Sequence, residues 1–557
     1  MNADDSVQFS LGGLEVRVWP DRFAMGAGGV PYFELSVRSS VETADGEADI
    51  DGDVLAFERG EREGRPWFQW TTRSSLWERK CYTLELFADA FAYRVAVSGK
   101  GRLGRVAYFT GAGRPATWGS RYEIARYFVP SPGGGSTSLP EYRSSAQDGR
   151  VGLHYLAPPL LAFPCTLDAP ASPWLAIGLA PRPGAYNIDH FAYHFNVVAG
   201  GSTRACFSTD YLGYTAVDGE AEVAAIVGTL GADEFASLER HAAWLYDHGG
   251  CTRRDRTAEP PWWRGPLFCG WGEQGTYNPR APKDAATQAN YSDMCRRLDD
   301  LRLEPSAIII DDMWMSTYGE ALPDPAKWPD LRAFADEQHA RGRRVMLWFK
   351  AWNTEGLPVD ECINLWSQPC GADPNAPAYR TRMHTIMATL LGDGEGCMNC
   401  DGFKVDFANV MPLGRNLRGT TSAYGLELLK QWFTLFASAA RAVKPDCLIN
   451  ASCAHPYFAD VTDQCRLHDY YWGQRSAWTV MTTRQRLFRA AMPGVLIDTD
   501  GVASTHCETM DYIRRCPELG VPDLYFLTGT PDFRLSEADF EVIREVWRRY
   551  AADSEGA

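Results

Sequence analysis

Hydrophobic and polar positions alternate through the first part of the chain, in short segments separated by turns. Residues 14–19, 93–97 and 192–197 are examples of this alternation. Such a pattern is typical of strands that bury one face and expose the other. We therefore predict an all-β sandwich domain for residues 1–255.

The pattern changes after Trp262, where short β-rich runs alternate with longer helical stretches, as in parallel βαβ units. The predicted strands are 267–271, 307–311, 344–349, 402–407, 447–452, 464–469, 494–498 and 523–528. Helices are predicted at 288–301, 331–340, 425–443, 479–491 and 537–550, with a short one near 235–248 before the boundary. Eight such strands fit one (β/α)8 TIM barrel, so we predict an α/β domain over 256–557.

Chemistry-bearing side chains recur at the C-terminal ends of these strands, where barrel active sites lie. In chain order, the candidates are Trp271, Asp311, Asp312, Trp314, Trp348, Lys350, Lys404, Asp406, Arg466, His468, Asp469 and Trp472. Each has a structural alternative, because an Asp at a strand end can cap a helix or form a turn, and a Trp can fill the core. Their shared position at successive strand ends favours a catalytic interpretation.

Two of these carboxyl groups suit a retaining glycosidase, which needs a nucleophile and an acid/base about 5–5.5 Å apart. Asp406 on the fourth strand and Asp469 after the sixth can face each other across a barrel mouth. Lys404 lies two residues before Asp406 on the same strand face, where an ammonium would favour the ionised nucleophile, although the two could also form a structural ion pair. The acid must keep its proton, and the aromatic run after Asp469 could supply the necessary apolar surroundings.

These residues resemble glycoside hydrolase clan D, the α-galactosidase or melibiase group of family 36 type. The resemblance covers about half of the chain and is carried by Trp271, by Asp311-Asp312-Met313-Trp314, by 327–331 with 342–349, and by Lys404-Val405-Asp406. It implies Asp406 as nucleophile and Asp469 as acid/base, with Asp311, Asp312 and Lys404 binding sugar hydroxyls and Arg466 supporting the site. A β-sandwich before the barrel also matches the larger members of this group.

The chain departs from the pattern at two places. Met313 stands where the group has glycine, and Arg466 precedes Asp469 by three positions where the group has four, which makes Asp463 a reserve candidate for the acid/base. The α-glucosidases of family 31 are similar as well, through Asp401-Gly402-Phe403-Lys404-Val405-Asp406 and through Trp472 after Asp469. Both groups share the barrel, the mechanism and the order of roles.

We therefore expect a retaining α-glycosidase, α-galactosidase-like, acting through a glycosyl-aspartate intermediate. A family 31-like α-glucosidase or a transglycosidase is the alternative, and a catalytically silent carbohydrate-binding protein is an alternative of another class. The sugar, its linkage and its aglycone stay open, although Met313 and Lys350-Ala351-Trp352 indicate a pocket unlike that of an ordinary galactosidase.

Composition and charge disfavour two classes of partner, nucleic acids and membranes. The formal net charge of −16 disfavours nucleic acid, and no run of about 18 apolar residues would span a membrane. The N-terminus lacks the basic and apolar regions of a signal peptide, so we expect a cytoplasmic protein with reduced thiols. We expect an oligosaccharide or glycoside substrate and no cofactor, and a homo-oligomer is possible.

Two further motifs lie near the predicted site. Cys362, Cys370, Cys397 and Cys400 could form a structural zinc site, but the first pair is too widely spaced for the usual pattern, so we favour free or locally paired thiols. Asp498-Thr499-Asp500-Gly501 follows the seventh strand and favours a turn, with substrate or calcium binding as the alternatives. A loop near 132–138 is the candidate contribution of the sandwich to the pocket.

Overall fold

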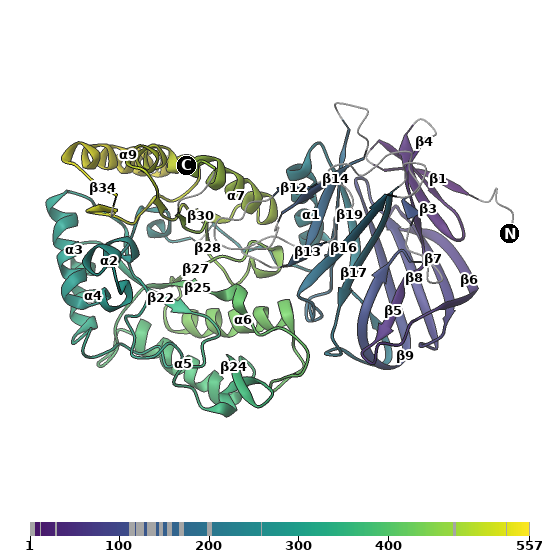
Figure 1. The fold of residues 1–557 in the computed structure, drawn as a ribbon, viewed down its shortest axis with the longest axis horizontal. Helices are drawn as coiled ribbons and strands as arrows, with labels where there is room; N and C mark the ends of the chain where they lie inside the picture. The colour runs from purple at the N-terminus through teal and green to yellow at the C-terminus, as the bar shows by residue number, and fades with distance from the viewer. Residues whose placement is uncertain are drawn as a thin grey trace.

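The computed structural model describes residues 6–11, 13–27, 30–110, 117–118, 127–130, 141–143, 149–152, 159–165, 172–197, 203–257, 259–471, 475–530 and 532–555. A β-rich N-terminal part lies beside an α/β C-terminal part (Figure 1). The loop expected near 132–138 lies outside the described residues, and so does Trp472.

The N-terminal part is built from antiparallel strands. One sheet consists of β1 (Val7–Leu11), β2 (Leu14–Val18), β3 (Arg22–Ala27) and β4 (Val30–Ser36). The strands of the larger sheet system are β5 (Ser40–Thr43), β6 (Asp51–Arg62), β7 (Arg65–Ser74), β8 (Arg79–Leu86), β9 (Ala90–Tyr108), β10 (Thr117–Trp118), β11 (Tyr127–Val129), β12 (Glu141–Arg143), β13 (Gly149–Gly152), β14 (Leu160–Pro164), β15 (Trp174–Ala180), β16 (His190–Val197), β17 (Thr203–Asp210), β18 (Ala216–Glu222) and β19 (Ala225–Gly231).

The long strand β9 joins the two layers of this part. Its first half pairs with β8 and β19, and its end, from Arg105 to Tyr108, pairs with β17. Alternate side chains of β9, such as Phe91, Tyr93 and Val95, are buried in the core between the layers. The predicted β-sandwich is therefore confirmed.

The C-terminal part contains, among the described residues, one eight-stranded parallel sheet in which every predicted barrel strand is present. Its strands are β20 (Leu267–Cys269), β21 (Ala307–Ile310), β22 (Arg344–Lys350), β25 (Gly402–Asp406), β27 (Leu448–Ala451), β28 (Gln464–Arg466), β30 (Leu496–Asp498) and β32 (Asp523–Leu524). They lie in chain order around the sheet, and β32 pairs with β20. A parallel bridge between Asp498 and Val521 closes the ring, which confirms the TIM barrel.

Helices surround this barrel (Figure 1). The helices are α2 (Trp271–Tyr277), α3 (Gln288–Asp300), α4 (Leu331–Ala340), α5 (Pro377–Leu391), α6 (Gly425–Val443), α7 (Ala477–Ala491), α8 (His506–Arg515) and α9 (Glu537–Glu555), with α1 (Glu234–Asp247) before the barrel. Short strands in the loops are β23 (Cys362–Leu365), β24 (Gln368–Ala372), β26 (Leu417–Arg418), β29 (Tyr470–Tyr471), β31 (Val502–Ala503), β33 (Gly529–Thr530) and β34 (Phe533–Arg534). The helices predicted at 288–301, 331–340, 425–443, 479–491 and 537–550 are confirmed, apart from small shifts at their ends.

Several predicted strands are shorter than expected, the one at 523–528 most of all. In two of them, the chain turns before a candidate residue. The first strand ends at Cys269, because Trp271 already begins α2. The sixth strand ends at Arg466, because His468 adopts a left-handed conformation (φ 65°) that a strand cannot continue through. Asp469 therefore lies on a loop beyond the strand.

The two parts pack directly on each other. The ring of Tyr186 stacks on that of Tyr457 with centroids 3.9 Å apart, and α1 packs on α7. The backbone N–H of Tyr424, which precedes α6, donates to Asn187 Oδ1 at 3.0 Å. The boundary at residue 255 falls in the segment between α1 and β20 and stays a prediction.

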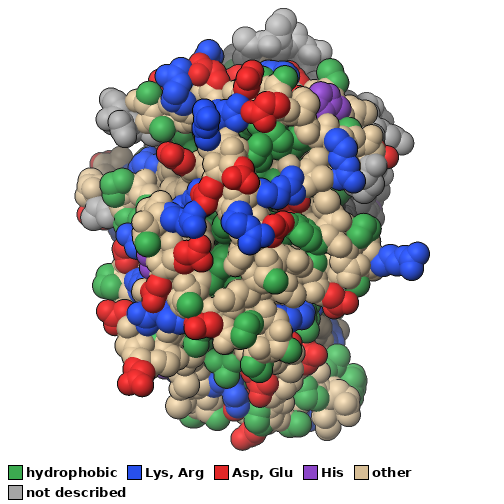
Figure 2. All heavy atoms as spheres, turned by 90° about the vertical axis from the view of Figure 1, so that its left-hand side faces the viewer, with side chains coloured by type: hydrophobic (Ala, Val, Ile, Leu, Met, Phe, Trp, Pro, Cys, Tyr) green, Lys and Arg blue, Asp and Glu red, His purple; other side chains and the backbone are tan. Residues whose placement is uncertain are grey.

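The barrel end of the molecule faces the viewer in Figure 2. Acidic and basic side chains are interspersed on this face, so the net negative charge is not gathered there into one patch. Within the described segments, no helix is long and apolar enough to cross a membrane.

Candidate active site

Lys404 and Asp311 form a buried ion pair at the centre of the barrel. Lys404 Nζ lies 2.8 Å from Asp311 Oδ2 and also donates to the Tyr525 hydroxyl at 3.1 Å. Burial is the largest influence and opposes the charged ammonium, but Asp311 and its other neighbours together raise the pKa of Lys404 well above its usual value. The thiol of Cys269 donates to the same Asp311 oxygen at 3.1 Å. Lys404 therefore pairs with Asp311 and not with Asp406, contrary to the expected pairing along its own strand.

Asp406, at the end of β25, is held by three donors. Arg466 Nη2 reaches Asp406 Oδ1 at 2.5 Å, and the backbone N–H of Phe407 donates to the same oxygen at 2.9 Å. The Trp348 indole donates to Oδ2 at 3.2 Å. Together the three donors hold the carboxylate in one orientation. About a quarter of the Asp406 side chain (23%) is exposed, so the carboxylate is accessible from the mouth.

Arg466 bridges two carboxylates. Its Nη1 lies 3.0 Å from Asp500 Oδ2, while Nη2 binds Asp406. Burial opposes the charge on Arg466, but the two carboxylates outweigh it and raise its pKa. Asp500 is fully buried, and it also accepts hydrogen bonds from Tyr525 and from the backbone N–H of Gly501. Although burial favours its neutral form, Arg466 is the strongest of the groups that lower the pKa of Asp500.

Asp469 lies on the loop after β28, next to Asp500. Burial, and then the negative charge of Asp500, raise the pKa of Asp469 well above that of an ordinary carboxyl group. Its Oδ2 accepts a hydrogen bond from the Tyr471 hydroxyl at 3.0 Å, and Tyr471 in turn accepts from the Trp271 indole at 3.1 Å. Asp469 Oδ1 has no hydrogen-bond partner among the described residues. The pKa of Asp469 is thus raised and that of the neighbouring Asp500 is lowered.

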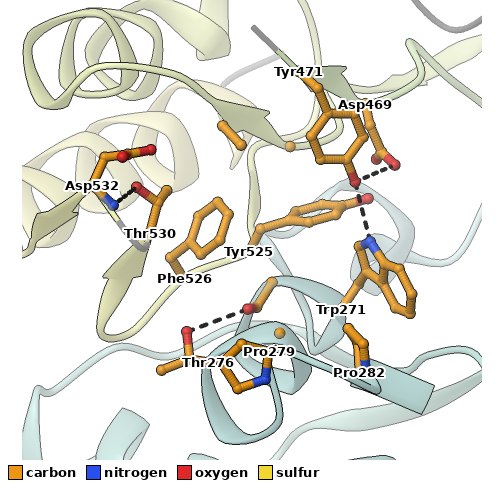
Figure 3. A pocket seen from close by; sticks show the side chains of 14 residues that line it. Trp271, Thr276, Pro279, Pro282, Asp469, Tyr471, Tyr525, Phe526, Thr530 and Asp532 are labelled. Carbon is orange, nitrogen blue, oxygen red and sulfur yellow. Dashed lines mark hydrogen bonds between the residues drawn. The ribbon is translucent and has the colours of Figure 1, made fainter.

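A cavity of about 310 Å³ opens beside Asp469. Figure 3 shows the chain of hydrogen bonds from Trp271 through Tyr471 to Asp469 on one side of this cavity, with the rings of Tyr525 and Phe526 next to it. Trp271, Tyr471, Tyr525 and Phe526 contribute aromatic surface to its walls, which suits the apolar faces of a sugar ring. Asp406 does not line this cavity and is linked to it through Arg466 and Asp500.

Asp312 lies on the opposite side of the mouth in a second cluster. Tyr318 donates to Asp312 Oδ1 at 2.8 Å, and Lys283 Nζ lies 3.1 Å from Oδ2. Burial raises the pKa of Asp312 above its usual value. Lys350, the last residue of β22, lies with its ammonium 4.3 Å from the centre of the Tyr318 ring.

The segment between β21 and Trp314 bends sharply at the position where the sequence departs from the resembled family. Met313 has a left-handed backbone (φ 73°), a conformation that glycine adopts without strain. Trp314 is completely buried, and its indole donates to the carbonyl of Trp348 at 2.8 Å. Trp314 therefore supports Trp348 from the core and is not placed to touch a sugar directly.

The structure separates the two candidates for the acid/base. Asp463 precedes β28, at the end of the barrel away from the mouth, and is fully buried. It pairs there with Arg254 and Arg441 and accepts from the backbone N–H of Ile449. Asp469 follows the same strand and lies at the mouth. His468 is buried beside it, with its carbonyl bound by Arg484.

Several site residues were not predicted from the sequence. These are Tyr525, Cys269, Tyr318 and Lys283. Tyr471 belongs to the aromatic run expected around Asp469, and substrate binding by the Asp500 segment was only an alternative. The motif around Asp500 was interpreted as a turn, and its backbone does turn there (φ 55°), but its carboxylate points at Arg466. Its place after the seventh strand was the one signal that could have included it among the site residues.

No group of three or more His, Cys, Asp or Glu side chains within the described segments is arranged to hold a metal ion. Cys362 and Cys370 donate to backbone carbonyls near their own hairpin, and Cys400 is buried. Every cysteine, including Cys397, is a free thiol. The four-thiolate zinc site is thus not formed by these residues as the structure places them.

The sequence matches no protein-family model and no curated protein. The fold is similar to that of an α-galactosidase of glycoside hydrolase family 36 from Geobacillus stearothermophilus in complex with stachyose. That match has a TM-score of 0.62 and 10% identity, over 99% of this chain and 86% of that chain. An α-galactosidase from Lactobacillus brevis matches with a TM-score of 0.57 and 10% identity, over 99% of this chain and 84% of that chain.

A sulfoquinovosidase of family 31 from E. rectale, in complex with an aza-sugar inhibitor, is a further neighbour. It has a TM-score of 0.59 and 10% identity, over 96% of this chain and 82% of that chain. Both families that the sequence resembles are therefore represented among proteins of this fold. At such low identity the likeness establishes the shared architecture of sandwich and barrel.

Proposed function

We propose that the protein is a retaining α-glycosidase in which Asp406 is the nucleophile and Asp469 the acid/base. The observation that carries this proposal is that one barrel mouth holds two carboxyl groups in opposite electrostatic surroundings. Asp406 is bound by a guanidinium and two N–H donors. The pKa of Asp469 is raised by burial and by Asp500. A double displacement requires this difference, because one carboxyl group attacks while the other donates a proton.

The reaction would proceed in two balanced steps. Asp406 attacks the anomeric carbon as the bond to the leaving oxygen breaks, and Asp469 transfers its proton to that oxygen. The products of this step are a glycosyl ester of Asp406 and the free aglycone. In the second step the Asp469 carboxylate takes a proton from water, whose oxygen displaces Asp406 and restores both groups.

The remaining residues would bind the sugar. Asp311, Asp312 and Lys404 supply polar atoms to hydroxyl groups, and Trp271 and Trp348 supply aromatic surface. Trp271 borders the cavity beside Asp469, and Trp348 contacts the nucleophile. Arg466 touches Asp406 and Asp500 and would act as a positioning residue that orients the carboxylate of the nucleophile. His468 and Trp472 stay candidates.

The structural neighbours support the general class of reaction and leave the sugar open. They include α-galactosidases and a sulfoquinovosidase, and another neighbour is a cycloalternan-degrading enzyme from Trueperella pyogenes in complex with isomaltose. We favour an α-galactosidase-like specificity because the Asp311-Asp312-Met313-Trp314 segment resembles that group. A family 31-like α-glucosidase or a transglycosidase is the alternative. A silent carbohydrate-binding protein would have no need for the contrast between Asp406 and Asp469.

The test is hydrolysis of a panel of 4-nitrophenyl α-glycosides, comprising galactoside, glucoside, xyloside and N-acetylgalactosaminide. Asp406→Asn should lower kcat by at least about a thousandfold, because the covalent intermediate cannot form. Asp469→Asn should lower kcat/KM by about a hundredfold or more on alkyl glycosides, whose leaving group needs a proton, and far less on the 4-nitrophenyl glycosides. The first-formed sugar, followed by NMR, should keep the α configuration.

Asp218→Asn is the matched control, because this aspartate lies on the sandwich with 80% of its side chain exposed. Its activity should equal that of the unmodified protein. Inversion of configuration would refute the double displacement. Sugar binding without turnover, even of glycosyl fluorides, would instead support the silent binding protein. Release of 4-nitrophenol with a glycosylated acceptor as the product would identify a transglycosidase.

A further inference from the structure

Lys350 lies at the mouth directly opposite the nucleophile. In the pairing of β22 with β25, Trp348 lies opposite Lys404, and Lys350 lies opposite Asp406. Side chains two residues apart on a strand leave the same face. Trp348 points to the face of β22 that carries its contact with Asp406. Lys350 leaves β22 on this same face, two residues nearer to the C-terminal end of the strand and so to the mouth.

The surroundings of Lys350 are aromatic. Its ammonium lies 4.3 Å from the centre of the Tyr318 ring and 5.3 Å from that of Phe407. Both rings pack near Trp348, with centroids 5.8 and 6.2 Å from its own. The Phe407 side chain is 41% exposed, so this corner of the mouth is open to a ligand. The ring faces attract the ammonium through cation–π contacts. They do not accept hydrogen bonds from it as a carboxylate would.

The other cations of the mouth already have carboxylate partners. Lys404 pairs with Asp311, Lys283 with Asp312, and Arg466 with both Asp406 and Asp500. Lys350 forms no ion pair within 4.0 Å and no hydrogen bond with any other described residue. Its charge is thus available to a ligand.

We propose that Lys350 binds an anionic group of the substrate, a carboxylate, sulfonate or phosphate carried by the sugar or by its aglycone. This inference rests on the proposed glycosidase function and names the substrate class of that site. The carboxylates of the mouth repel a negatively charged substrate unless a cation compensates. A neutral glycoside requires no such compensation. The Lys350 ammonium provides this compensation, because it lies opposite the nucleophile, is open to the mouth and has no carboxylate partner of its own.

The experiment compares matched neutral and anionic substrates. One arm pairs 4-nitrophenyl α-glucoside and α-galactoside with the corresponding glucuronide, galacturonide, 6-sulfonate and 6-phosphate, which place the charge on the sugar. A second arm keeps the neutral sugar and adds a carboxylate to the nitrophenyl ring. The proteins are the unmodified chain, Lys350→Met and Lys100→Met, a control on the sandwich whose lysine side chain is 82% exposed.

We expect the unmodified chain to prefer the anionic member in one arm, and that arm identifies where the charge lies. Lys350→Met should lower kcat/KM for that substrate by about tenfold or more, through KM, and leave the neutral substrate within about twofold. Lys100→Met should change neither. Equal losses for both substrates would show that Lys350 only balances the charge of Asp406, and would overturn the inference. An unmodified chain that prefers the neutral substrates would overturn it as well.

A binding measurement separates this inference from the proposed reaction. Calorimetric titration with glucuronate, galacturonate, glucose and galactose requires no turnover. If no glycoside is hydrolysed, the glycosidase proposal fails. Tighter binding of a uronate than of its neutral sugar, lost in Lys350→Met, would still support the anionic site. Equal binding of both sugars in that case would overturn it.

Discussion

Asp469 and Asp500 lie side by side at the barrel mouth, and their pKa values move in opposite directions. Burial raises the pKa of Asp469, and the charge of Asp500 raises it further. Asp500 is buried as well, but Arg466 and the neighbouring Asp469 lower its pKa. Within the pair, Asp469 is therefore the carboxyl group that binds a proton more readily.

This relationship predicts how the pH profile responds to Asp500→Asn. The alkaline limb of kcat/KM reports the ionisation of the acid in the free enzyme. Without the neighbouring negative charge, the pKa of Asp469 falls, although burial still keeps it above the ordinary value. The alkaline limb should therefore move to lower pH. The measurement is kcat/KM of the best glycoside between pH 4 and 10.

Asp532→Asn is the control for this profile, because Asp532 lines the same cavity without being among the groups that shift the pKa of Asp469. Its alkaline limb should coincide with that of the unmodified chain. A limb that stays in place in Asp500→Asn would assign the titration to a group other than Asp469.

The raised pKa of Asp469 also predicts that this residue destabilises the fold at neutral pH. Above the unfolded-state pKa of about 3.9, the unfolded carboxyl group ionises while the folded one keeps its proton, so stability falls as the pH rises towards the folded pKa. Asp469→Asn cannot ionise, and its Tm should therefore exceed that of the unmodified chain at pH 7 to 8. The difference should disappear near pH 4. A difference in Tm that is constant across this range would contradict the assignment.

Hydrophobic patterning was sufficient to predict the barrel, because each buried strand leaves a short apolar run between helical stretches. The run at 307–310 and the Lys404-Val405-Asp406 strand are the clearest cases, and both are strands in the structure. A parallel barrel also brings the C-terminal ends of all its strands to one mouth, whatever their side chains are. The sequence could therefore predict which residues gather there.

The partners within the mouth could not be predicted in the same way. Lys404 was expected beside Asp406, but strand register brings its ammonium to Asp311 and leaves Asp406 to Arg466. Such pairings depend on side-chain length and on the tilt of the strands. For Asp500 a turn was favoured over substrate binding, because a turn sequence is equally compatible with a structural role, and only the position of Arg466 distinguishes the two.

Met313 provides a test of backbone strain next to Asp312. Its left-handed φ of 73° costs an ordinary residue about 1–2 kcal/mol. Met313→Gly relieves this strain but adds freedom to the unfolded chain, so we expect a net gain in stability of about 0.5–1 kcal/mol. Met313→Val should instead lose about 1–2 kcal/mol, because β-branched residues tolerate this conformation least. Calorimetric scans should thus rank the variants glycine, methionine, valine, and another order would refute the strained backbone.

Two buried histidines at the junction of the sandwich and the barrel predict acid sensitivity. His241 on α1 and His455 before η5 (Pro456–Phe458) are both completely buried. Burial lowers the pKa of His241 to about 4 and that of His455 to about 3. The neighbouring ring of Tyr186 packs edge-on against His455, 5.8 Å away, and offers no charge to stabilise a protonated imidazole. Both side chains are therefore neutral in the folded protein.

Protonation of the unfolded chain should then weaken the fold as the pH decreases below about 6.5. In that range the unfolded imidazoles bind protons and the folded ones do not, so stability is lost progressively until the folded pKa values are reached. For His241 the shift of the pKa from 6.5 to about 4 corresponds to roughly 3 kcal/mol.

We expect Tm to fall between pH 6.5 and 4.5 in the unmodified chain and to fall less in His241→Leu and His455→Leu. His384→Leu, on the exposed face of α5, is the control and should retain the full slope. Equal slopes in all four proteins would show that other groups govern the acid sensitivity.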